Sequence, residues 1–134
     1  MDYEIAAQTD VGTVKRTNQD SIMMKRIFTN LGNMVFAVLC DGMGGLAKGE
    51  LASATVIRAF DKWVNDDLQM ICQNGPGYIE DSVIRAQWES IVANQNQKIK
   101  QYGAGQGVNL GTTVVALLVT DRRYYLMNVG DSRA

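Results

Sequence analysis

The sequence predicts an α+β domain in which strands and helices come in groups. The 134 residues include 46% hydrophobic and 20% charged side chains, a composition typical of one globular domain. Two long segments carry apolar residues at helical spacing, and several shorter segments are apolar or rich in β-branched residues. The expected order is three strands, two helices and two strands, which favours layered α+β packing over an alternating parallel sheet.

Three strands are expected in the first third of the chain. Tyr3, Ile5 and Ala7 alternate with polar neighbours, as in a strand with one buried face. Residues 21–29 are mixed in character, and residues 34–40 form an unbroken apolar run. The third strand is therefore expected to be buried.

Two helices and a hairpin are expected in the remainder. Residues 46–68 and 78–102 carry apolar side chains at intervals of three and four, which predicts helices with one buried face. Residues 112–120 and 123–129 are β-branched and aromatic and are separated only by a short polar turn. This pattern predicts a β-hairpin.

Composition excludes several classes of function. The 13 basic and 14 acidic residues give a net charge of -1, so we expect neither nucleic-acid binding nor a membrane-surface role. The longest apolar runs are far shorter than the roughly 20 residues of a membrane helix, and a cytoplasmic protein is expected. Histidine is absent, which removes histidine-dependent triads and zinc-protease motifs.

Three acids stand beside expected strands. Asp41 ends an apolar strand and precedes Gly42, Asp131 follows a strand and a glycine, and Asp20 precedes the strand at 21–29. Two carboxylates about 4 Å apart repel by about 4 kcal/mol at an effective dielectric constant of 20, so convergence would imply a bound cation. The alternative for Asp41 is a plain strand-to-helix turn in which the carboxylate caps the helix.

Two adjacent cations, Lys15 and Arg16, precede Asp20. One interpretation pairs a phosphate-facing cation with a metal-facing acid. The other is a solvated turn whose charges have no specific role.

Five motifs resemble, in order, those of the PP2C-type (PPM family) metal-dependent protein phosphatases, especially the bacterial serine/threonine members. They are GTVKRTNQDS, VLCDGMGG, AKGELAS, LGTTVVALLV and VGDSRA. The resemblance spans nearly the whole chain. It implies part of a β-sandwich flanked by helices, with residues 1–134 forming the N-terminal portion of one phosphatase domain whose second half is incomplete.

The resemblance also implies roles for individual residues. Asp41 matches the aspartate that bridges two metal ions, and Gly42 matches the glycine that offers its carbonyl oxygen to one of them. Asp20 matches the second of the family's paired acids near the start, Gln19 stands where many members have the metal-side glutamate, and Asp131 matches a residue associated with a third, weaker metal. The phosphate-binding cation of the family falls on Lys15 by spacing, with Arg16 beside it, and the choice between them stays open.

The implied activity is hydrolysis of phosphoserine and phosphothreonine in proteins at a two-metal centre of Mn²⁺ or Mg²⁺, with a serine/threonine kinase as the counterpart enzyme. The later aspartates of the family are absent from this chain, so weak metal binding and little activity are expected of it alone. An uncovered apolar sheet face and unpaired strand edges are also expected, and with them a homodimer or domain-swapped assembly. The alternative function is a non-catalytic, phosphatase-like interaction module.

Overall fold

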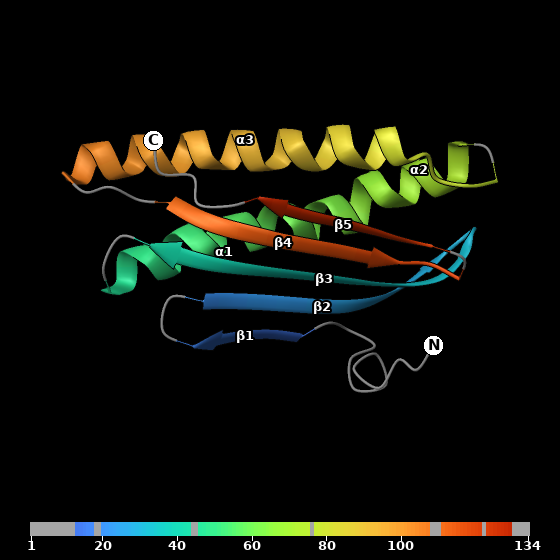
Figure 1. Cartoon of the computed structure of the whole chain (residues 1–134), viewed down its shortest axis with the longest axis horizontal. Helices are drawn as coiled ribbons and strands as arrows, with labels where there is room; N and C mark the ends of the chain where they lie inside the picture. Colours follow the sequence, from blue (N-terminus) through green and yellow to red (C-terminus); the bar gives the residue numbers. More distant parts are fainter. Residues whose placement is uncertain are drawn as a thin grey trace.

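The computed structural model describes residues 13–17, 20–43, 46–75, 77–107, 111–121 and 123–129. These residues form one antiparallel sheet with the strand order β1-β2-β3-β4-β5, and helices that pack against it (Figure 1). The elements are β1 (Thr13–Thr17), β2 (Asp20–Thr29), β3 (Gly32–Met43), α1 (Leu46–Lys62), η2 (Trp63–Asp67), α2 (Leu68–Asn74), α3 (Asp81–Gln106), β4 (Gly111–Val119) and β5 (Tyr124–Val129). The predicted α+β class is confirmed.

The four strands expected between residues 21 and 129 are present as β2, β3, β4 and β5. The strand expected around Tyr3, Ile5 and Ala7 lies outside the described residues. Residues 13–17, where a solvated turn was one of two interpretations, form strand β1 instead. Among the described strands β1 lies at the edge of the sheet, where sequences with charged residues such as Lys15 and Arg16 are tolerated.

The first predicted helix is longer than its apolar spacing indicated. Helix α1 continues through the π-helical turn η2 into α2, which ends at Asn74. The π-helical turn places Trp63 and Val64 in the core, and the indole nitrogen of Trp63 donates a hydrogen bond of 2.6 Å to Gln87 Oε1 on α3. This contact joins the two long helical segments.

The second predicted helix begins and ends later than expected. Helix α3 starts at Asp81 and continues to Gln106, into residues that were expected to form a loop. It ends at Gly107, whose φ of 73° is the left-handed conformation in which glycine commonly terminates helices. None of the helices in the described ranges is both long and apolar enough to cross a lipid bilayer.

One face of the sheet is covered by helices. Helix α1 packs against β2, β3 and β4, and α3 packs against β4 and β5. Figure 1 shows α1 passing behind the sheet and α3 running along the β5 side. Every second residue of β3 faces this layer and is fully or nearly fully buried: Met34, Phe36, Val38 and Cys40. The period-two burial is that of a strand with one face in the core.

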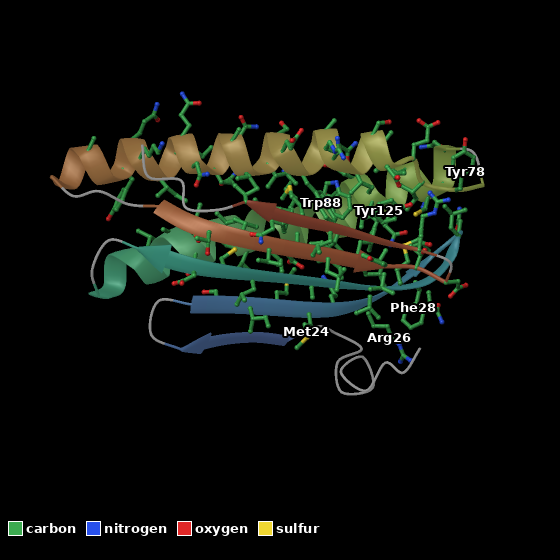
Figure 2. All side chains as sticks on the ribbon, viewed as in Figure 1. Met24, Arg26, Phe28, Tyr78, Trp88 and Tyr125 are labelled. Carbon is green, nitrogen blue, oxygen red and sulfur yellow. The ribbon has the colours of Figure 1, made fainter. Side chains whose placement is uncertain are left out.

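The opposite face of the sheet is apolar and exposed, and no described helix or strand covers it. Phe28, Leu39, Tyr124 and Leu126 lie on it and are 60%, 41%, 66% and 61% exposed. Figure 2 labels Phe28 with Met24 and Arg26 on the β2 side of this face, whereas Trp88 and Tyr125 lie toward α3. We call this surface the open face.

The turn between β2 and β3 depends on Gly32. Its φ is 111°, a conformation that favours glycine, and a Cβ there would lie 3.2 Å from the carboxylate of Asp121. Gly32→Ala is therefore expected to lower the free energy of unfolding by about 1–3 kcal/mol, measured by urea denaturation. The control is Gly77→Ala, since a Cβ at Gly77 meets nothing within 4 Å. Equal effects of the two substitutions would contradict the prediction.

Candidate metal centre

The structure brings two of the predicted carboxylate residues to one position. Asp20 begins β2 and Asp41 stands near the end of β3, and the two are direct partners in the antiparallel register. Residues directly opposite each other in such a pair have Cβ atoms about 4.5–5.5 Å apart and point to the same side of the sheet. Asp41 is exposed and belongs to the open face, in the row of Leu39. We call the end of the sheet that carries this pair the carboxylate end.

The chemistry of this pair fits a hard divalent cation. Like charges directly opposite each other destabilise a sheet, and a cation between them removes that cost. Carboxylate and carbonyl oxygens are the ligands that Mg²⁺ and Mn²⁺ prefer. Gly42 follows Asp41 directly, so its carbonyl oxygen lies one residue away from the pair.

The backbone at Asp41 and Gly42 is held from the neighbouring strand. Gly42 is the register partner of Thr112 on β4. The Thr112 hydroxyl, which is fully buried, donates a hydrogen bond of 3.2 Å to the carbonyl oxygen of Asp41. Sequence reasoning missed Thr112; the available signal was a pair of hydroxyl residues at the start of an otherwise apolar strand.

Cys40, next to Asp41, is not suited to nucleophilic or ligand chemistry. Its side chain is completely buried on the helix-covered face. Burial raises the pKa of its thiol to about 12, and a hydrogen bond with Thr112 opposes part of that rise. Because the thiolate is the reactive and metal-binding form, Cys40 acts as a small apolar core residue.

The strand register places the two candidate phosphate-binding residues, Lys15 and Arg16, in different rows of the sheet. Lys15 pairs with Ile22 and Arg16 pairs with Ser21. Ile22 stands two residues from Asp20 and therefore in the same row, whereas Ser21 is fully buried under the helices. The register therefore puts Lys15 in the same row as Asp20 and Asp41, and Arg16 in the row of Ser21.

The structure does not describe the remaining predicted metal ligand. Asp131 lies outside the described residues, so its convergence with Asp20 and Asp41 stays a prediction. In the part of the chain that the structure describes, no group of three or more acids, cysteines or histidines could hold a metal ion. The described centre is therefore a pair of acids with one adjacent backbone carbonyl.

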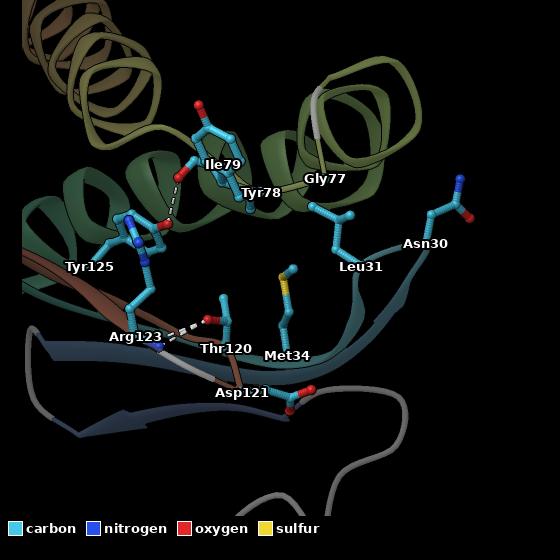
Figure 3. Close-up of a pocket in the computed structure, with 10 residues that line it drawn as sticks. All are labelled: Asn30, Leu31, Met34, Gly77, Tyr78, Ile79, Thr120, Asp121, Arg123 and Tyr125. Atoms are coloured by element: carbon cyan, nitrogen blue, oxygen red, sulfur yellow. Dashed lines mark hydrogen bonds between the residues drawn. The ribbon is translucent and has the colours of Figure 1, made fainter.

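A cavity of about 440 Å³ lies at the other end of the sheet, beside the two hairpin turns (Figure 3). Two of its polar groups already have structural partners: the Tyr125 hydroxyl donates a 2.8 Å hydrogen bond to the carbonyl of Ile79, and Arg123 lies 3.6 Å from Asp81. Since Asp41 is at the far end of its strand from this cavity, we place the candidate site at the carboxylate end.

The described part of the chain is thus an antiparallel sheet with helices on one face and a register pair of acids at one end, which makes that end a candidate metal site. The sequence pattern of the protein phosphatase 2C family matches residues 12–134. The chain therefore belongs to the protein phosphatase 2C family, as its motifs indicated.

Individual relatives agree with this assignment. A 2C-type protein phosphatase of Streptococcus pyogenes is 31% identical over 97% of this chain and 48% of its own length. The serine/threonine protein phosphatase PstP of Mycobacterium tuberculosis is 34% identical over 96% of this chain and 21% of its own length. The solved structure of the Streptococcus agalactiae serine/threonine phosphatase has a TM-score of 0.61 and 29% identity, and the match covers 93% of this chain and 47% of that one. The chain thus spans about half the length of its streptococcal relatives.

Proposed function

We propose that this protein removes phosphate from phosphoserine and phosphothreonine side chains of other proteins with the help of Mn²⁺ or Mg²⁺. The observation that carries the proposal is the register pairing of Asp20 with Asp41 at one end of the sheet. The family assignment supports the same reaction class, since its relatives are serine/threonine phosphatases.

In this proposal Asp41 and Asp20 hold the cations through carboxylate oxygens, and Gly42 contributes its carbonyl oxygen. Asp131 supplies a further, weaker contact. Cations bound there lower the pKa of water and neutralise charge on the phosphate. The rigid register of β2 and β3 keeps the acids in place before any ion binds, which reduces the cost of organising the site.

A cation from the chain offsets the charge of the phosphoryl group. We assign this role to Lys15 rather than Arg16, because the backbone position of Lys15 shares a row with Asp20. The effect is electrostatic stabilisation and requires no proton transfer. A lysine supplies a point charge here rather than the two-pronged contact of an arginine.

The partners in this proposal are phosphorylated proteins, with a serine/threonine kinase as the opposing enzyme. The 134-residue chain alone is expected to turn over little substrate, because two acids and one carbonyl supply only part of the six oxygens that such cations require. A homodimer or swapped assembly and a cytoplasmic location stay predictions from the sequence.

A titration of the chain with Mn²⁺ by calorimetry tests the proposal. Asp20→Asn is expected to weaken binding at least tenfold, since it removes one of two charged ligands. Asp66→Asn is the control, because Asp66 is an exposed acid on the π-helical turn between α1 and α2, outside the register pair. Unchanged binding in Asp20→Asn, or no binding by the unmodified chain, would overturn the proposed site and favour a non-catalytic interaction module.

A further inference from the structure

The buried polar side chains of the described residues gather at one place. They are Ser21, Ser53 and Thr112, each with no exposed surface. Ser21 follows Asp20 on β2 and pairs in register with Cys40, and its hydroxyl lies 2.9 Å from that of Ser53 on α1. Thr112 is the register partner of Gly42. Among the described residues, the fully buried hydroxyl side chains of serine and threonine therefore lie behind the carboxylate end.

Thr112 is the member of this group that contacts the candidate metal-binding backbone. Its hydroxyl oxygen lies 3.2 Å from the carbonyl oxygen of Asp41 and 2.9 Å from that of Thr113. The other residues on the same side of β4 are Val114, Ala116 and Leu118, which are apolar and fully buried. A valine would fill the position of Thr112 with a similar shape, so the hydroxyl is not needed to fill space.

The hydrogen bond has a geometric consequence for the next residue. The carbonyl of Asp41 and the amide of Gly42 belong to one planar peptide unit. Fixing the carbonyl oxygen therefore restrains ψ of Asp41 and φ of Gly42, the two rotations that connect this unit to the Asp41 side chain on one side and to the Gly42 carbonyl on the other. Glycine has no side chain to limit its own rotation, so its carbonyl direction depends on contacts from outside.

We propose that Thr112 is a positioning residue for the metal centre: its hydroxyl orients the peptide unit between Asp41 and Gly42 so that their oxygens converge on one cation. This inference rests on the proposed function. Thr112 is fully buried on the helix-covered side, opposite to the open face, and reaches the carboxylate end through its hydrogen bond to the backbone of Asp41, beside its shorter contact with the backbone of Thr113.

The test compares Mn²⁺ affinity by calorimetry for variants of the chain at this position. Thr112→Ser and Thr112→Ala differ by a single oxygen atom. The serine variant is expected to bind within about threefold of the unmodified chain, and the alanine variant 10–100-fold more weakly, the range found when a partner that orients a metal ligand is lost. Thr112→Val, which keeps the shape of the side chain, is expected to match the alanine variant.

Val114→Ala is the stability control, since Val114 is fully buried on the same side of the same strand. It is expected to lower the melting temperature without changing Mn²⁺ affinity. Equal affinity of the serine and alanine variants, or an equal loss in Val114→Ala, would overturn the role of Thr112 while leaving the acid pair in place. Absence of Mn²⁺ binding by the unmodified chain would instead overturn the metal site itself, and the role of Thr112 with it.

Discussion

Asp41→Asn is expected to stabilise the metal-free protein and to abolish its stabilisation by Mn²⁺. Asp41 is the register partner of Asp20 and is exposed, so water screens the pair and removing one charge relieves a repulsion of roughly 0.2–1 kcal/mol, well below that of two carboxylates held about 4 Å apart. In the proposed metal site the same change also removes a charged ligand. At a concentration 100 times the dissociation constant, Mn²⁺ stabilises the unmodified protein by about 2.7 kcal/mol, and this gain is expected to vanish.

Thermal unfolding with a chelator and with Mn²⁺ measures both effects on Asp41→Asn. The gain in stability of Asp41→Asn over the unmodified protein, measured in the chelator, is expected to shrink at high salt, because salt screens the repulsion between exposed carboxylates. Asp66→Asn is the matched control and is expected to keep the full response to Mn²⁺. A full Mn²⁺ response in Asp41→Asn would place the metal elsewhere.

Phe36→Ala is expected to cost about 3–5 kcal/mol of unfolding free energy, the largest loss of stability among these predictions. Phe36 is fully buried at the centre of an aromatic cluster. Its ring centroid lies 5.9 Å from that of Phe60, 5.8 Å from that of Trp63 and 5.8 Å from that of Trp88. One substitution therefore removes contacts between the sheet and both helical segments.

Urea denaturation of Phe36→Ala against Phe28→Ala provides the measurement. Phe28 is 60% exposed and its main specific contact is Arg26, whose guanidinium carbon lies 5.9 Å from the ring centroid. Phe28→Ala is expected to lower the free energy of unfolding by about 1 kcal/mol or less. Similar costs for the two phenylalanines would mean that the cluster does not organise the core.

Local patterns in the sequence were sufficient for most elements but not for the way they pair. The apolar run at 34–40 and the helical spacing at 78–102 predict β3 and α3, whose burial follows that spacing. Strand β1 was not predicted because its two charged residues, Lys15 and Arg16, are typical of a strand only at the edge of a sheet. The π-helical turn at Trp63 depends on the packing of α1 against its neighbours, which no local pattern encodes.

The candidate site depends on register in the same way. The acidic residues Asp20 and Asp41 were identified from their positions at strand ends, but their direct opposition follows from the tight turn that pairs Thr29 with Gly32. A slip of one residue would move one acid to the other side of the sheet. Thr112 was missed for a related reason: its contact with Asp41 spans 71 positions in the sequence.

The open face couples ion binding at the proposed acid pair to the covering of the apolar sheet surface. Leu39 and Asp41 lie in one row of β3, so any surface that covers the apolar part of this face also excludes water beside the acid. Excluding water strengthens both the repulsion within an empty acid pair and its attraction for a cation. Binding of an ion at the proposed acid pair and covering of the face are therefore linked, and each changes the affinity for the other by the same factor.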